Sequence, residues 1–242
     1  MEKLGKVFKR RVPGKENVGN RSVFITKEGL KCVYKPCEVF DEGENRAPTI
    51  IFLHGAGTRG TNAGHLANNS LFKLADLSHY QVFAPLCSVD TWIDCHEKLK
   101  SLVEHIRRDP RTDPERVYCV GNSMGGYGTW QLAISMPDAF AVIIPICGGG
   151  MAWNTGRLQT TVVRAFHGGA DHTVATEESV RMVERAVKKG VDATLTIYPE
   201  TGHNSWDPTY KNKELFDWMR TVRKAKEPLP PQTEFKDPII YG

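Results

Sequence analysis

Six short apolar runs, separated by segments with helical patterning, constrain the fold of this 242-residue chain more than any other feature. The runs span residues 49–53, 81–84, 116–120, 141–147, 161–166 and 194–198. As a group they lack the apolar–polar alternation of a strand that has one face in water. Strands without that alternation are covered on both faces, which is typical of a parallel central sheet between two layers of helices.

Between and after these runs, apolar residues recur at intervals of three and four, the spacing of one helix face. Two such stripes are clear and a third is looser: Leu99, Leu102, Val103 and Ile106; Leu215, Trp218, Met219 and Val222; Val180, Val183 and Val187. Upstream, residues 21–26 and 30–36 read as two strands around a Lys-Glu-Gly turn. The chain is therefore predicted to be α/β, with a mostly parallel central sheet, helices on both faces and an N-terminal antiparallel edge hairpin. Functional residues belong at the carboxyl ends of its strands.

The two ends of the chain differ in composition from its body. We expect a basic N-terminal arm over residues 1–20, a single α/β domain over residues 21–226, and an extended Pro-rich tail over residues 227–242 that lies on the surface or is disordered. The first 21 residues carry seven basic and two acidic side chains, against a net charge of +4 for the whole chain. Because no recognised nucleic-acid motif accompanies them, we expect a solvated arm and no nucleic-acid partner.

Composition also limits the class of protein. Apolar residues make up 40% and charged residues 25% of the chain, as in ordinary globular proteins. The uncharged segment 139–153 is shorter than the roughly 18 to 20 apolar residues that a membrane span needs. The N-terminus lacks the apolar core of a secretory signal, and the six cysteines show no C-x-x-C spacing. We therefore expect no membrane span, reduced thiols and a cytoplasmic location.

A G-x-S-x-G pattern, Gly121-Asn-Ser-Met-Gly125, directly follows one apolar run and precedes a helical stretch. In this strand–turn–helix context the serine occupies a strained turn, and side chains two residues before and after it would collide with the neighbouring strand and helix. Glycine at both positions removes that obstacle. The pattern predicts that Ser123 is a nucleophile, with a glycine-rich αβ connection as the non-catalytic alternative.

A serine nucleophile needs a general base and a group that orients the base. The acid should follow a late strand, which favours Asp171 over Asp138 and Asp207, although an aspartate here could simply cap a turn. His203 follows the last apolar run, where a loop can bring its imidazole over the serine. The other histidines form no recognised metal-binding spacing, and those before glycines, His54 and His167, are expected to shape loops.

Acyl transfer also needs hydrogen-bond donors for the developing oxyanion. We expect the backbone N–H groups of Met124 and of Ala56, which lies in the glycine-rich loop after the first buried run, to supply them. That loop matches neither phosphate-binding glycine pattern, and a simple turn is the alternative.

Three tryptophans, Trp92, Trp153 and Trp206, fall on loops after predicted strands. They are candidates to bind the substrate as apolar walls, with ordinary core packing open for each. The longest loop in this region, residues 151–159, is too short for a substantial lid. We therefore expect an open site that acts on dissolved substrates.

Five motifs, taken in order, resemble those of the α/β-hydrolase superfamily: Leu53-His-Gly-Ala-Gly, Gly121-Asn-Ser-Met-Gly-Gly-Tyr-Gly-Thr-Trp130, Pro145-Ile-Cys-Gly-Gly-Gly150, Ala165-Phe-His-Gly-Gly-Ala-Asp171 and Gly202-His-Asn-Ser-Trp-Asp-Pro208. Within it, residues 20–222 are most similar to compact phospholipase/carboxylesterase or prolyl-oligopeptidase-like (predicted peptidase) esterases, related to feruloyl esterases. The resemblance implies an α/β-hydrolase fold and a triad of Ser123, Asp171 and His203. It also implies an oxyanion hole formed by Ala56 and Met124.

These observations together predict a serine carboxylester hydrolase that works through an acyl-enzyme on small soluble or aromatic acyl esters. A serine peptidase or acyl-aminoacyl hydrolase on the same triad is the first alternative, and a catalytically silent binding protein is the second. We expect a small-molecule ester as the partner and neither a cofactor nor a metal. The oligomeric state is left open.

Overall fold

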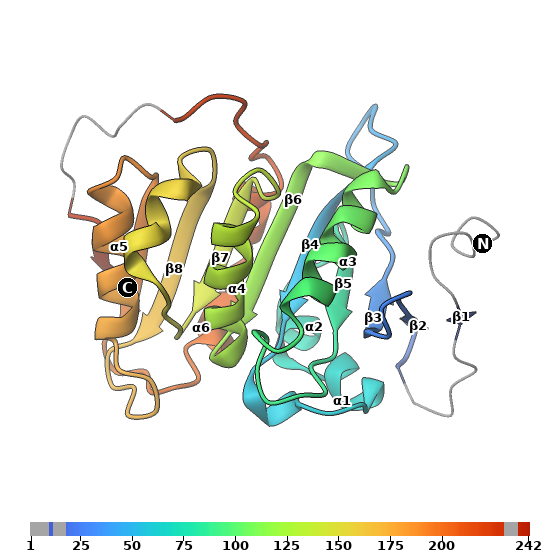
Figure 1. Ribbon diagram of the computed structural model, residues 1–242, viewed down its shortest axis with the longest axis horizontal. Coiled ribbons are helices and arrows are strands. Elements are labelled where there is room, and N and C mark those ends of the chain that lie inside the picture. The colour runs from blue at the N-terminus through green and yellow to red at the C-terminus, as the bar shows by residue number, and fades with distance from the viewer. Residues whose placement is uncertain (1–9, 12–17, 230–236) are drawn as a thin grey trace.

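A ten-stranded sheet forms the centre of the molecule in the computed structural model, which describes residues 10–11, 18–229 and 237–242 (Figure 1). The strands are β1 (Arg10–Arg11), β2 (Ser22–Ile25), β3 (Lys31–Lys35), β4 (Ala47–Leu53), β5 (Gln81–Pro85), β6 (Thr112–Asn122), β7 (Val142–Ile146), β8 (Val162–Gly168), β9 (Ala193–Tyr198) and β10 (Ile239–Tyr241). Their order is β1-β2-β3-β5-β4-β6-β7-β8-β9-β10. The pairs from β1 to β5 are antiparallel and all others are parallel, so the mostly parallel sheet and its antiparallel edge are confirmed.

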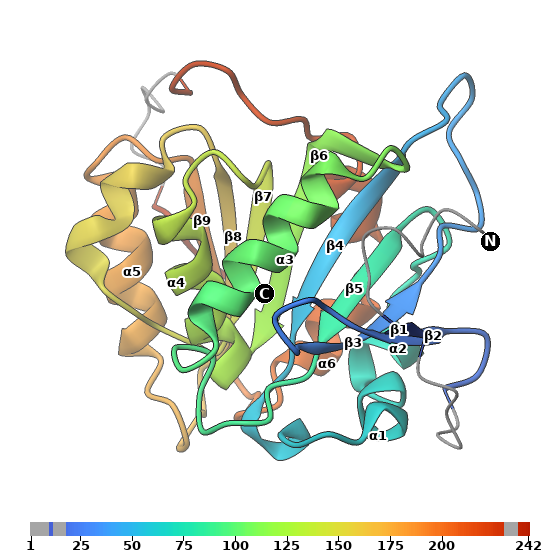
Figure 2. The same ribbon diagram turned by 45° about the vertical axis from the view of Figure 1, so that its right-hand side comes forward.

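Helices cover both faces of the sheet. They are α1 (Ala63–Ala67), α2 (Ser70–Leu74), α3 (His96–Arg108), α4 (Met124–Ser135), α5 (Glu177–Val187), α6 (Trp206–Lys211) and α7 (Lys213–Met219), with short 3-10 helices η2 (Ala56–Thr58) and η3 (Ala152–Leu158). Helices α3, α4 and α5 cover one face, and α1, α2, α6 and α7 pack against the other (Figures 1 and 2). In β4, Ile51 and Leu53 enter the first core and Ile50 and Phe52 the second. Burial on both faces explains the continuous apolar run.

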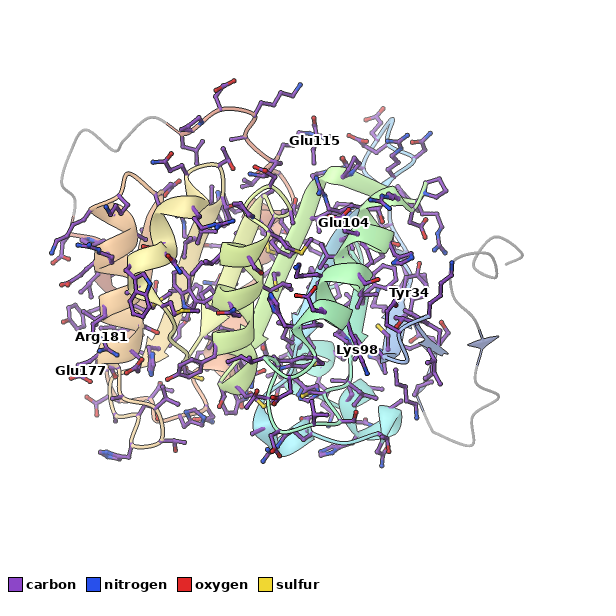
Figure 3. All side chains as sticks on the ribbon, viewed as in Figure 1. Tyr34, Lys98, Glu104, Glu115, Glu177 and Arg181 are labelled. Carbon is purple, nitrogen blue, oxygen red and sulfur yellow. The ribbon has the colours of Figure 1, made fainter. Side chains whose placement is uncertain are left out.

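The stripes predicted for α3 and α5 face the sheet, and charged residues occupy their outer sides. Figure 3 shows Lys98 and Glu104 on α3, and Glu177 and Arg181 on α5, directed away from the core. This separation of apolar and charged faces is why both helices could be predicted from spacing alone.

Two elements differ from the sequence expectation. Strand β9 alternates buried and partly exposed residues, so it is not covered on both faces along its length. The last predicted helix ends at Met219, and Val222 lies beyond it. There the chain turns toward β6, because the carbonyl of Val222 accepts a hydrogen bond from the Tyr118 hydroxyl at 3.0 Å and Lys224 N–H donates to the Glu115 carbonyl at 2.7 Å.

The C-terminal tail contributes a strand that sequence analysis did not anticipate. Residues 239–241 are extended and pair in parallel with β9, Ile240 opposite Thr196. The exposed side chains of Ile240 and Tyr241 give this pairing little apolar burial. Residues 230–236 lie outside the described part of the chain, as does the expected basic arm apart from residues 10–11 and 18–20.

All six cysteines are free, as expected, and all except Cys37 are buried. Among the residues that the structure describes, no helix combines the length and the apolar character needed to cross a bilayer.

Candidate active site

The candidate residues come together at the carboxyl edge of the parallel strands, the lower edge of the sheet in Figure 1. Ser123 follows β6, Asp171 follows β8 and His203 follows β9. Residues 80 and 32 positions apart in sequence become neighbours in this way, as parallel strands bring their ends to one edge.

Ser123 occupies a strained turn between β6 and α4, with φ 55° and ψ −122°. A side chain at Gly125 would overlap the carbonyl group of Leu53, and one at Gly121 would overlap the carbonyl group of Gly125. The N–H of Ser123 donates to the Ile146 carbonyl at 2.9 Å, which fixes the turn to β7. The glycines are therefore needed for close packing, and the turn lifts the serine side chain off the sheet edge.

His203 bridges the serine and the carboxylate. Its Nε2 lies 2.9 Å from Ser123 Oγ and its Nδ1 lies 2.8 Å from Asp171 Oδ2. The other carboxylate oxygen, Oδ1, accepts from the amides of Thr173 at 2.8 Å and Val174 at 2.9 Å. The Asp171 side chain is fully buried, whereas 23% of the His203 side chain is exposed. This arrangement lets the imidazole take a proton from the serine beside a negative charge that water does not screen.

The electrostatic environment keeps Asp171 ionised. Burial alone raises the pKa of its carboxyl, but the hydrogen bonds from His203 and from the amides of Val174 and Thr173 outweigh it, and the pKa lies below its usual value. Asp171 is the carboxylate within the described residues that hydrogen bonds to His203. The weaker candidates lie elsewhere: Asp138 is exposed beyond α4, and Asp207 lies in the first turn of α6.

The loop after β4 passes beside Ser123. A Cβ at Gly55 would lie 3.0 Å from Asn122 Nδ2 and 3.5 Å from Ser123 Cβ. Ala56 begins η2 and Met124 begins α4, and the first N–H groups of a helix have no acceptor within their own helix. Both amides expected to bind the oxyanion are thus placed at helix starts on the two segments nearest the serine.

His54 fixes the conformation of that loop, a specific role that spacing did not reveal. Its Nδ1 lies 2.8 Å from the Gly55 carbonyl, so Nδ1 carries the proton, and Nε2 accepts from the amide of Cys87 at 3.1 Å. Burial lowers the pKa of His54 to about 4, which keeps the ring neutral in this tautomer. The indole N–H of Trp92 donates to the His54 carbonyl at 3.0 Å. The only sequence signal was a histidine before a glycine at a strand end.

The three tryptophans have different positions. Trp92 is only 2% exposed, and its ring packs against the His54 ring and Gly128, so the expectation of a substrate-facing wall is wrong for this residue. Trp153 on η3 is 68% exposed. Trp206 packs against His203, with its ring edge-on at 5.3 Å between centroids.

Two further residues of the site were not identified from sequence. Asn122 accepts a hydrogen bond from the Tyr210 hydroxyl at 3.1 Å, which ties the serine turn to α6. Cys147, with φ 41°, follows β7, and its sulfur lies with ligand atoms of Asp171 and His203 in a group within 4.8 Å of one another. Such a group could hold a metal ion, but burial raises the pKa of the thiol to about 12, and the protonated thiol is a poor ligand.

Comparison with known proteins finds a depolymerase by sequence and esterases and peptidases by structure. A poly(3-hydroxyalkanoate) depolymerase C of Paucimonas lemoignei is 34% identical over 77 residues, which cover 32% of this chain and 18% of that protein. A thermostable esterase is 28% identical with a TM-score of 0.65 over 84% of this chain and 63% of its own. Thus the chain spans under a fifth of the depolymerase and less than two thirds of the esterase.

Two structures with lower identity share the fold. An acylaminoacyl peptidase of Pyrococcus horikoshii is 17% identical with a TM-score of 0.61, covering 89% of this chain and 43% of its own. Est1E of Butyrivibrio proteoclasticus is 13% identical with a TM-score of 0.60, covering 83% of this chain and 99% of its own. The expected α/β-hydrolase fold is confirmed. The sequence pattern of the dienelactone hydrolase family matches residues 81–224, more than half of the chain, and this protein belongs to that family.

Proposed function

We propose that this protein is a serine carboxylester hydrolase that works through an acyl-enzyme. The observation that carries the proposal is the position of His203, whose two ring nitrogens lie within hydrogen-bond distance of Ser123 Oγ and of a buried carboxylate. A hydroxyl at neutral pH becomes a nucleophile only with such a base, and the base needs such an orienting group.

The reaction follows from these contacts. Ser123 Oγ attacks the acyl carbon while His203 Nε2 takes its proton, and the ionised Asp171 stabilises the resulting imidazolium. The N–H groups of Met124 and Ala56 stabilise the oxyanion of the tetrahedral intermediate. When that intermediate collapses, His203 returns the proton to the leaving alcohol oxygen. Water activated by His203 then attacks the acyl-enzyme and releases the acid, and Ser123 is regenerated.

We propose small soluble or aromatic acyl esters as the substrates. The segment between β7 and β8 forms the 3-10 helix η3, which packs beside α5 and α4, and its length leaves no residues for a closing lid. Trp206 presents an aromatic ring next to His203, where it can contact an apolar acyl group. The similarity to the depolymerase makes 3-hydroxyacyl esters a natural member of the test panel.

Labelling with a fluorophosphonate tests the nucleophile. We expect one label per chain, at Ser123, and no labelling of Ser123→Ala. The matched control is Ser135→Ala, at the other end of α4, where the hydroxyl donates to backbone carbonyls. Stoichiometric labelling of Ser123→Ala rules out the assignment.

The choice between ester and amide needs its own comparison. Matched p-nitrophenyl esters and p-nitroanilides of acetyl, 3-hydroxybutyryl and cinnamoyl groups should show ester turnover far above amide turnover. Equal or preferred anilide turnover favours the peptidase alternative on the same triad.

A further inference from the structure

A second imidazole lies beside the acid of the proposed triad. His167 lies at the end of β8, four residues before Asp171, and its side chain is completely buried. Its Nε2 lies 3.3 Å from Asp171 Oδ2, the same oxygen that contacts His203 Nδ1, and 3.0 Å from the Val174 carbonyl oxygen. Both neighbours of Nε2 can only accept, so this nitrogen carries a proton whatever the charge of the ring.

The other side of the ring is held just as closely. His167 Nδ1 lies 2.7 Å from Ser179 Oγ of α5, and that hydroxyl lies 2.8 Å from the Gly148 carbonyl oxygen after β7. The single hydroxyl proton goes to Nδ1 when the ring is neutral and to Gly148 when Nδ1 is itself protonated. In both states the ring keeps its orientation, with Nε2–H bonded to the Val174 carbonyl and lying beside Asp171 Oδ2.

The carboxylate of Asp171 is thereby held by three hydrogen bonds and by the His167 ring, whose Nε2 lies beside Oδ2. The amides of Thr173 and Val174 donate to Oδ1, His203 Nδ1 lies at hydrogen-bond distance from Oδ2, and His167 Nε2 lies 3.3 Å from the same oxygen. Since the side chain is fully buried, no water competes for these positions. The carboxylate cannot rotate away from His203 without breaking contacts at both oxygens.

We propose that His167 is a positioning residue for the reaction: it holds Asp171 and the turn through Val174 in the orientation that His203 needs, and it shares the negative charge at Oδ2. The inference rests on the proposed triad. Because His167 withdraws charge from the oxygen that faces His203, it also sets how strongly Asp171 stabilises the imidazolium of His203. The Cys147 thiol and the Tyr127 hydroxyl also interact with the charge of Asp171, and burial raises the pKa of both, so both stay uncharged.

Two variants separate this role from simple packing. His167→Leu fills much of the same volume without a donor, and His167→Gln can place an amide N–H near the position of Nε2. We expect His167→Leu to lose roughly 10- to 100-fold in kcat with KM within about twofold, as small displacements of catalytic groups do. With more charge left on Oδ2, the lower limb of its kcat/KM pH profile should move to higher pH by roughly half a unit to one unit. His167→Gln should recover most of kcat and return the limb toward its wild-type position.

All rates are divided by the concentration of active sites titrated with fluorophosphonate, so that unfolded protein does not count. If His167→Leu does not fold, His167→Asn against His167→Gln gives the same contrast, because the asparagine amide reaches the position of Nδ1 and not that of Nε2. The proposal is supported if His167→Asn has a lower kcat and a lower limb of the kcat/KM pH profile shifted to higher pH, while His167→Gln shows neither change.

Two results would overturn the proposal. In the first, a variant that lacks the N–H at the position of Nε2 keeps the wild-type kcat and the wild-type kcat/KM pH profile. In the second, His167→Leu and His167→Gln lose activity equally and the lower limb of the pH profile does not shift in either. Failure of the proposed function looks different. In that case Ser123→Ala and Asp171→Asn keep their turnover, whatever the substitutions at His167 do.

Discussion

At the scale of single residues, Asp171 holds His203 in the tautomer that can accept a proton from Ser123. An amide in its place would direct N–H toward His203 and favour the wrong tautomer. Asp171→Asn should therefore lose roughly 10⁴-fold in kcat. Asp207→Asn, in the first turn of α6, should stay within about threefold of wild type. Steady-state kinetics on one activated ester checks both variants, and greater damage from Asp207→Asn would mean that the acid is wrongly chosen.

His54 links stability to pH. Its folded pKa is about 4, whereas an unfolded histidine titrates near 6.5. The unfolded chain therefore binds more protons, and the contribution of His54 to stability is complete above about pH 6.5 and lost as the pH falls toward 4. We expect this group to lower the free energy of unfolding by roughly 2 kcal/mol between pH 8 and pH 5.

Urea denaturation of wild type and His54→Asn at both pH values measures this effect. The asparagine cannot titrate, so the difference in unfolding free energy between the two pH values should be smaller by about that amount. Parallel pH dependence in the two proteins would show that His54 is not the group responsible.

At the scale of elements, the strand–turn–helix around Ser123 depends on the absence of side chains. Gly125→Ala should lower the free energy of unfolding by roughly 1–3 kcal/mol or more, because its Cβ would overlap the Leu53 carbonyl, and activity should be lost with the turn. Gly57→Ala is the matched control, since no atom lies within 4 Å of a Cβ there, and its stability should change by less than about 0.5 kcal/mol. Equal effects of the two substitutions on thermal unfolding would contradict the steric account.

The same elements explain what could be predicted from sequence. The position of Ser123 followed from local sterics, which glycine spacing reports directly. Strands β4 and β7 were visible because every residue in them is buried. Strand β10 was not, because its pairing with β9 is nonlocal and its side chains are largely exposed.

Side-chain contacts across the sheet edge were also beyond prediction. The hydrogen bonds between His54 and Cys87 and between His167 and Ser179 join segments that become neighbours only when the sheet folds. Trp92 could have been a substrate-binding wall or a core residue, and its burial shows that it is a core residue. The sequence pattern does not show whether a loop residue is buried.

For the whole molecule, the short connection between β7 and β8, which contains η3, predicts whether the enzyme acts on dissolved or on aggregated substrate. An enzyme without a lid should hydrolyse dissolved esters with ordinary saturation kinetics and should not need a lipid–water interface for activity. Rates for a short-chain ester and a long-chain triglyceride, followed across their solubility limits, check this expectation. A sharp rise only when an emulsion forms, with little activity on the dissolved ester, would require a gated site.

If the proposed mechanism holds, Ser123 carries the acyl group during turnover. The most direct measurement is rapid acid quenching during the reaction with p-nitrophenyl acetate, followed by intact mass and peptide mapping. We expect a burst of p-nitrophenol of about one equivalent and a transient acetyl mass on the peptide containing Ser123. Ser123→Ala should show neither. An acetyl group on another residue that forms and decays at the rate of turnover, or turnover in Ser123→Ala at the wild-type rate, would contradict the account.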